Sequence, residues 1–119
     1  MDDETAVAAL GELRRQGAVD DGRYARNFVH DRRELDGWGA ERIRERLEEA
    51  GVEREVIDAA LGENGEAELG AAVAVLARRM EPPDDDRARA RAFGLLVRKG
   101  YESDLAYEAV RRFEDSGVD

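Results

Sequence analysis

Cysteine is absent from this 119-residue sequence. Its absence excludes a disulfide framework, a thiolate zinc site and a cysteine nucleophile. His30 is the single histidine, so no metal site and no other cofactor is expected. The carboxylates lie in runs typical of exposed helix faces and caps, and the sequence has no Gly-rich phosphate loop and no nucleophile motif. These absences predict a protein that is not an enzyme and has no small-molecule substrate.

Long hydrophobic runs are also missing. No apolar stretch approaches the roughly 18 residues that a membrane-spanning helix needs. The first residues, MDDETAVAAL, are acidic where a secretory signal would be basic. We therefore expect a cytoplasmic protein with no membrane partner.

Proline occurs only twice, whereas 40% of the residues are charged. This composition is typical of amphipathic helices that bury a narrow apolar stripe. The 3.6-residue periodicity predicts an all-α fold, and one stripe holds Tyr24, Ala25, Phe28, Val29 and Leu35. The expected helices cover 3–16, 22–36, about 39–50, a short segment ending near 61, a segment that carries an apolar stripe from Leu69 to Met80, a segment after the Asp84–Asp86 cap, and about 102–114.

Two segments of the chain align without a gap. RIRERLEEAGVEREVIDAAL at 42–61 matches RAFGLLVRKGYESDLAYEAV at 91–110, and the match pairs Leu47 with Leu96 and Gly51 with Gly100. A chance similarity between two amphipathic helix pairs is the alternative explanation. The alignment predicts tandem three-helix repeats of about 50 residues in an elongated, curved array. The expected divisions are 1–17, the last helix of an incomplete first repeat, 18–62, a second repeat, and 63–119, a third repeat.

Basic residues gather in two places although the formal net charge is −10. On a helical wheel, one group lies within roughly 80° on the face opposite Phe28. The segment 87–100 contains a second group and no acidic residue. A solvated face is the alternative for the first group, and stabilisation of a helix C-terminus is the alternative for Arg98 and Lys99. The predicted partner-binding residues are Arg23, Arg26, His30 and Arg33 in the first group and Arg87, Arg91, Arg98 and Lys99 in the second.

Arg32 lies within the apolar stripe, between Phe28 and Leu35. A guanidinium in that position needs a partner. We favour a buried or half-buried ion pair with Asp20, Asp21 or Glu45 over direct contact with a ligand.

An ordered pattern over about 50 residues resembles the RecX family of recombination regulators. The matching residues are Gly17, Asp20, Asp21, Arg23, Tyr24, Ala25, Phe28, Val29, Arg32, Gly37, Gly39, Arg42, Ile43 and Leu47. The resemblance implies tandem three-helix modules, with the first two helices of the first module missing from this chain. It also implies a regulator without catalytic activity that acts in recombination, DNA repair and the SOS response.

The partner implied by this resemblance is the RecA recombinase filament on single-stranded DNA. Such a protein would enter the filament groove and limit filament growth, ATP hydrolysis and strand exchange, with only weak contact to single-stranded DNA. The alternative is a helix-turn-helix-like module that binds duplex DNA directly.

Overall fold

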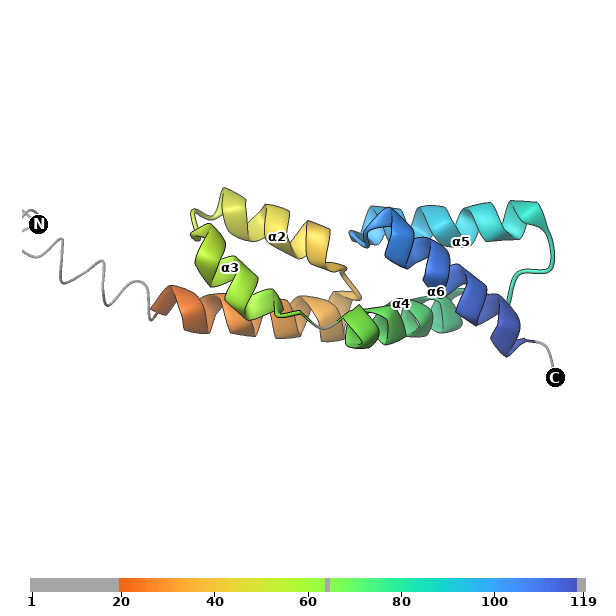
Figure 1. Cartoon of the computed structure of the whole chain (residues 1–119), viewed down its shortest axis with the longest axis horizontal. Coiled ribbons are helices and arrows are strands. Elements are labelled where there is room, and N and C mark those ends of the chain that lie inside the picture. The colour runs from red at the N-terminus through yellow and green to blue at the C-terminus, as the bar shows by residue number, and fades with distance from the viewer. Residues whose placement is uncertain (1–19, 64, 118–119) are drawn as a thin grey trace, which may run out of the picture.

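The computed structural model describes residues 20–63 and 65–117, and every regular element in those ranges is helical. An α-helix over 20–31 continues into a π-helical turn, η1 (Arg32–Asp36). The other elements are α2 (Ala40–Glu49), α3 (Arg54–Leu61), α4 (Gly65–Arg79), α5 (Asp86–Lys99) and α6 (Ser103–Ser116) (Figure 1). The all-α prediction is confirmed. The predicted helix over 3–16 lies outside the described residues.

Aspartate and glycine define the ends of α5, as the sequence predicted. The Asp85 carboxylate accepts a hydrogen bond from the backbone N–H of Ala88 at 2.8 Å, which satisfies a donor in the first helical turn. Gly100 ends the helix with φ of 100°, a left-handed conformation that favours glycine. Local chemistry is therefore sufficient to place both ends of this helix.

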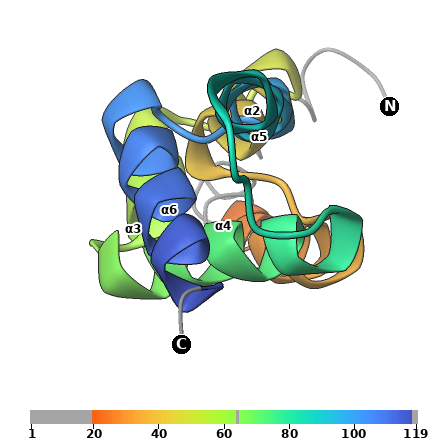
Figure 2. The same ribbon diagram turned by 90° about the vertical axis from the view of Figure 1, so that its right-hand side faces the viewer.

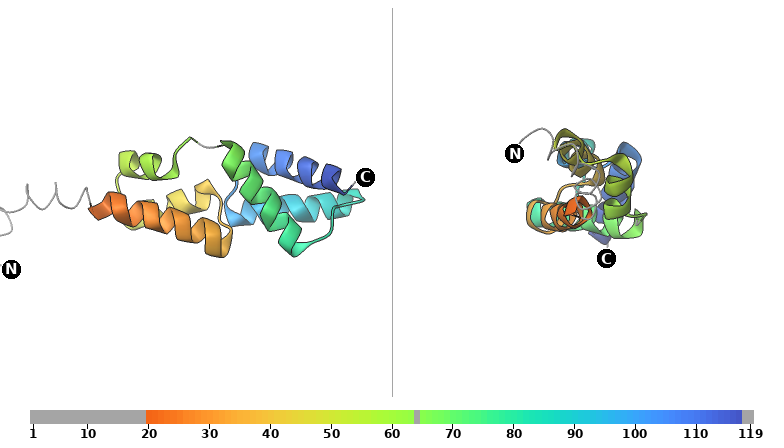
Figure 3. Two further views of the ribbon diagram at one scale, coloured as in Figure 1. Left: turned by 90° about the horizontal axis from the view of Figure 1, so that it is seen from below. Right: turned by 90° about the vertical axis from the view of Figure 1, so that its left-hand side faces the viewer.

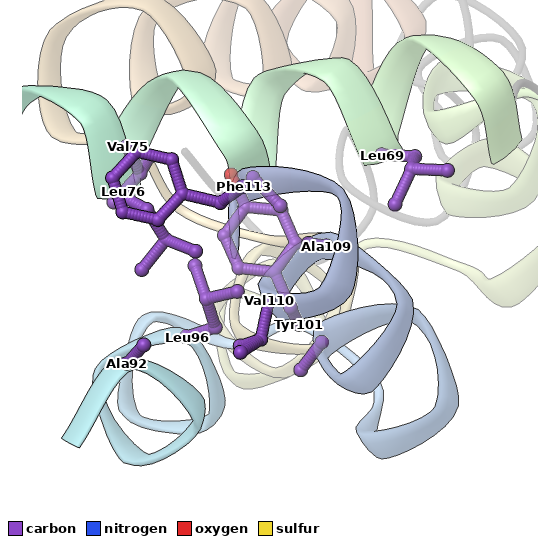
Figure 4. Close-up of a cluster of buried hydrophobic side chains, with 11 residues drawn as sticks. Leu69, Val75, Leu76, Ala92, Leu96, Tyr101, Ala109, Val110 and Phe113 are labelled. Atoms are coloured by element: carbon purple, nitrogen blue, oxygen red, sulfur yellow. The ribbon is translucent and has the colours of Figure 1, made fainter. Parts of the chain in front are cut away.

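The helices enclose two hydrophobic cores. The helix over 20–36 packs with α2 and α3 around one core, whereas α4, α5 and α6 enclose the other, which Figure 4 shows in close-up. We call these the N-terminal unit (20–61) and the C-terminal unit (65–116). The first core contains Ala25, Val29, Ile43, Leu47, Val52, Ile57 and Leu61. The second contains Leu69, Ala72, Val75, Leu76, Ala92, Leu96, Tyr101, Ala106, Ala109, Val110 and Phe113.

Corresponding positions in the two units have similar structure. Leu47 and Leu96 are both completely buried. Gly51 and Gly100 both have positive φ, at 85° and 100°. These pairs agree with the gap-free alignment of the two segments. The divisions at 17/18 and 62/63 stay predictions.

Two side chains of the predicted apolar stripe face solvent instead of the core. Tyr24 is 47% exposed and Leu35 is 74% exposed, so their predicted burial is wrong. Ala25 and Val29 fill the core side of the helix. Tyr24 lies at the edge of that stripe, and Leu35 lies in η1, where the wider π-helical turn changes the direction of successive side chains.

The two units form an elongated body in which α2 and α5 lie end to end (Figure 1). The view along the long axis places these two helices one behind the other, with the remaining helices to one side and below them (Figure 2). The view from below shows the same order of units along the axis (Figure 3). The elongated shape of the predicted array is therefore present in the described residues.

Backbone hydrogen bonds join the units where the N-terminus of α2 meets the C-terminus of α5. The N–H of Gly39 donates to the Lys99 carbonyl at 2.8 Å, and the N–H of Glu41 donates to the Gly100 carbonyl at 2.9 Å. Such N-terminal donors and C-terminal acceptors have no partner within their own helices. We call this contact, formed by residues 36–42 and 98–101, the junction.

Glycine allows the two backbones to approach at the junction. A Cβ atom on Gly39 would lie 2.5 Å from the Gly100 carbonyl oxygen, and a Cβ atom on Gly100 would collide with Arg42. The buried Tyr101 also contributes, because its hydroxyl donates to the Gly37 carbonyl at 3.1 Å. Gly37 and Gly39, both part of the pattern that resembles the RecX family, therefore lie where one unit joins the next.

Candidate functional site

The helix over 20–31 presents three of the predicted basic side chains to solvent. Arg23, Arg26 and His30 are all exposed. We call these three residues the N-terminal basic face. Their exposure leaves them available to a partner with negative charge, and their binding role stays a prediction.

Arg33 does not belong to this face, although the helical wheel placed it there. Its side chain is only 25% exposed, and its Nη2 donates to the Glu68 carboxylate at 3.3 Å. The same carboxylate oxygen accepts a hydrogen bond from the backbone N–H of Ala40 at 2.9 Å. The predicted exposure of Arg33 is wrong because α4 of the next unit covers this side of the helix.

Arg32 forms the half-buried ion pair that the sequence predicted, but with a different partner. Its Nη1 lies 2.6 Å from Asp36 Oδ2, one turn further along the same segment, and the two side chains are 30% and 37% exposed. The proposed partners Asp20, Asp21 and Glu45 are therefore wrong. Both members of the pair lie in η1, four residues apart, so the pair does not connect two helices.

In the second predicted basic group, too, some side chains are exposed and others contact the rest of the protein. Arg87, Arg91 and Arg98 are exposed, and none has an acidic side chain within ion-pair distance in the described part of the chain. Lys99 is half-buried, and its Nζ donates to the Asp36 carbonyl at 2.8 Å. Burial lowers the pKa of Lys99, and the charge of Arg79 lowers it further. Lys99 therefore stabilises the junction in addition to any role in binding.

Arg89, within the same segment, is engaged by the C-terminal helix. Its Nε and Nη2 donate to the Glu114 carboxylate at 3.0 and 2.7 Å, a two-point contact between α5 and α6. The hydrogen bonds from Arg89 hold the pKa of Glu114 below its usual range. This pair borders a cavity of about 480 Å³, whose lining also includes Phe93, Tyr107 and Val110.

A groove that was not predicted from the sequence lies between the helix over 20–36 and α2. The groove has a volume of about 440 Å³ and is lined by Tyr24, Phe28, Arg32, Trp38, Arg46, Glu49 and Ala50. We call it the aromatic groove. The single tryptophan, followed by arginines four and eight residues later, was the sequence signal that could have revealed it.

Three guanidinium groups surround the tryptophan of this groove. The Cζ atom of Arg42 lies 4.2 Å from the Trp38 ring centroid, and those of Arg46 and Arg32 lie 5.7 and 5.8 Å away. Phe28 contacts the same ring edge to face, with centroids 6.2 Å apart. The groove therefore combines aromatic surface with positive charge. Its guanidinium groups are attracted to the ring faces and keep N–H donors that can bind an anion.

Among residues 20–63 and 65–117, no group of three or more His, Asp or Glu side chains is arranged to hold a metal ion. In the same ranges, no helix is both long enough and apolar enough to cross a membrane.

The fold and these surfaces define a class of protein, an all-helical chain of consecutive three-helix units with exposed arginines. A profile of the RecX second three-helix domain matches residues 20–61, which correspond to the N-terminal unit. The Regulatory protein RecX of Thermus thermophilus is 37% identical over 112 residues, covering 94% of this chain and 72% of the relative. The corresponding protein of Stenotrophomonas maltophilia is 34% identical over 113 residues, covering 93% and 69%. The chain belongs to the RecX family.

The length of the chain relative to these proteins is also informative. The Regulatory protein RecX of Amycolatopsis mediterranei is 33% identical over 115 residues, covering 93% of this chain and 66% of that relative. For the Mycolicibacterium vanbaalenii protein the covered share of the relative is 64%. The chain thus spans about two thirds of the length of the curated relatives it matches.

Proposed function

We propose that this protein is a non-enzymatic regulator that binds the RecA filament on single-stranded DNA and limits its growth, ATP hydrolysis and strand exchange. Family membership carries the proposal, because the relatives are named regulatory proteins. The proposed site of action is the cytoplasm, in recombination and DNA repair, and the proposed activity needs no cofactor.

The exposed arginines on a chain of net negative charge support a protein partner that carries both positive and negative side chains. Arg23 and Arg26 are exposed on one unit, and Arg87 and Arg91 are exposed on the other. The formal net charge of −10 opposes tight binding to isolated nucleic acid, since phosphate affinity comes from an excess of basic side chains. We therefore infer that RecA supplies most of the affinity and that DNA contributes a weak contact.

The elongated body, with its two units joined at the junction, supports docking along a repetitive filament. Backbone hydrogen bonds at the junction and the Arg33–Glu68 pair connect the two units. Preorganisation of this kind reduces the entropy lost on binding. Both units can then contact the filament at the same time.

A titration of the DNA-dependent ATPase activity of RecA tests the proposal. RecA is assembled on poly(dT), and the protein is added from zero to equimolar with RecA. We expect inhibition at substoichiometric protein, because one bound molecule blocks growth of a whole filament segment. No inhibition at equimolar protein would contradict the proposal.

The exposed arginines also leave direct binding to duplex DNA as a second candidate, which the same preparation can test. A duplex binder would bind a 20-bp DNA without RecA, and its affinity would fall steeply as salt increases. We expect weak duplex binding that does not account for the ATPase inhibition. Tight, steeply salt-dependent duplex binding in the absence of inhibition would favour the helix-turn-helix-like alternative.

A further inference from the structure

The aromatic groove leaves a large ring exposed beside two partly covered ones. Tyr24 is 47% exposed, although its ring contacts Phe28 at a centroid distance of 5.9 Å. Phe28 in turn contacts Trp38 at 6.2 Å, and both of these side chains are half-buried. Arginine side chains already lie over the Phe28 and Trp38 rings, so Tyr24 is the ring of this line that is available to a flat ligand.

Positive charge lies next to these rings. Arg46 lines the groove, is exposed, and has no acidic side chain within ion-pair distance among the described residues. Arg42 stacks on Trp38, and among its nitrogens only Nη1 has a hydrogen-bond acceptor in the described part of the chain, the Arg98 carbonyl at 3.3 Å. Glu49 is the one acidic side chain in the lining. The groove therefore has N–H donors left for an anion.

The cationic surface continues from the groove across the junction. A smaller cavity of about 250 Å³ is lined by Arg42, Arg46 and Arg98, together with Glu41, Glu45, Val97 and Gly100. Arg46 thus borders both hollows, and Arg42, which stacks on Trp38, lines the second. A chain that placed a flat group in the aromatic groove could pass over these arginines toward α5.

We propose that the aromatic groove binds an unpaired base of single-stranded DNA, stacked against Tyr24, with the adjacent phosphates on Arg46 and Arg42. This inference rests on the proposed function, in which the protein meets single-stranded DNA within the filament. Stacking on aromatic side chains beside a positive track is the general means of binding single strands without sequence preference. Duplex DNA does not expose its base faces, and an acidic peptide would use the arginines but not the rings.

The single tryptophan makes the groove directly observable. Trp38 is the only tryptophan of the chain, so tryptophan fluorescence, excited at a wavelength that tyrosine does not absorb, reports on this site alone. We expect (dT)12 at 50 mM salt to quench Trp38 fluorescence in a saturable manner. If two phosphates are neutralised, the affinity should fall about 7-fold between 50 and 200 mM salt. Absence of quenching at millimolar (dT)12, or equal quenching by a 12-bp duplex or by hexaglutamate, would overturn the proposal.

Substitutions of Tyr24 separate stacking from folding. Tyr24→Ala should weaken (dT)12 binding about 5- to 150-fold, the cost of losing one base–aromatic stack. Tyr24→Phe keeps the ring and should bind like the parent protein. Tyr107→Ala is the matched control, because Tyr107 is 62% exposed on α6 in the other unit. Unchanged binding by Tyr24→Ala with normal helix content by circular dichroism would contradict the inference.

The RecA ATPase titration, run in parallel, distinguishes failure of this inference from failure of the proposed function. Saturable, Tyr24-dependent (dT)12 binding without ATPase inhibition would contradict the RecA proposal and leave the groove assignment standing. ATPase inhibition without any (dT)12 binding would contradict the groove assignment alone.

Discussion

Replacing Gly39 by alanine should destabilise the protein through the junction. The backbone of Gly39 has φ of −87° and ψ of 172°, which alanine adopts without strain, so the effect isolates the close approach to Gly100. The added Cβ would lie 2.5 Å from the Gly100 carbonyl oxygen and 2.6 Å from the Tyr101 nitrogen, and neither backbone atom can rotate away. Overpacking of this kind costs about 1–3 kcal/mol.

Separation of the two backbones would also weaken their hydrogen bonds. The bonds from Gly39 to Lys99 and from Glu41 to Gly100, at 2.8 and 2.9 Å, contribute about 0.5–1.5 kcal/mol each. With partial relaxation, we expect Gly39→Ala to lower the free energy of unfolding by about 2–4 kcal/mol.

Urea denaturation followed by Trp38 fluorescence and by circular dichroism measures this loss. The matched control is Gly70→Ala in α4, where Gly70 is exposed and an added Cβ would contact nothing within 4 Å. That control should gain about 0.5–1 kcal/mol from the higher helix propensity of alanine. A Gly39→Ala protein as stable as the Gly70→Ala protein would refute the close-approach argument.

Three further predictions concern other parts of the structure. Glu68→Ala should lower the free energy of unfolding by about 1–2 kcal/mol, because it removes two hydrogen bonds between the units. In the same urea assay the control Glu66→Ala, at a side chain 79% exposed, should change the free energy of unfolding by less than about 0.5 kcal/mol. Burial raises the pKa of Tyr101 to about 12, so the tyrosine of the unfolded chain ionises first as pH rises above about 10. The free energy of unfolding should therefore fall by about 2–3 kcal/mol by pH 12, and Tyr101→Phe should remove this loss. A urea midpoint that does not change with pH would rule out this effect. Reversing Arg23 and Arg26 to Glu should keep helix content by circular dichroism but abolish inhibition of the RecA ATPase, and retained inhibition would show that this face is only solvated.

The helices could be predicted from the sequence because their signals are local. The cap at Asp85 and the stop at Gly100 depend on side-chain chemistry and backbone conformation within a few residues. The buried positions Ile43 and Leu47 follow from helical periodicity in the same way. The exposure of Leu35 could not be predicted, because a wheel with α-helical spacing does not describe the π-helical turn that contains it.

The candidate site was predictable only where exposure depends on one helix. Arg23 and Arg26 follow the wheel, since no other described element covers their face. Arg33 shares the same side of the wheel, but the next unit supplies Glu68 and encloses it. A wheel gives the direction of a side chain, not what lies in that direction.

The junction and the aromatic groove depend on contacts between segments far apart in the chain. The sequence alignment paired Gly100 with Gly51, but no local signal indicated that Gly39 packs against Gly100. In the groove, Tyr24 and Arg46 belong to different helices and meet only after the turn at 37–39 reverses the chain.

Direct binding to the filament tests the central claim, because inhibition of ATPase activity can also arise from sequestered DNA. RecA filaments are assembled on poly(dT) with a non-hydrolysable ATP analogue and sedimented in the presence of the protein. We expect saturable co-sedimentation with RecA filaments and little with poly(dT) alone. Protein that stays in the supernatant at micromolar filament concentration would contradict binding to the filament.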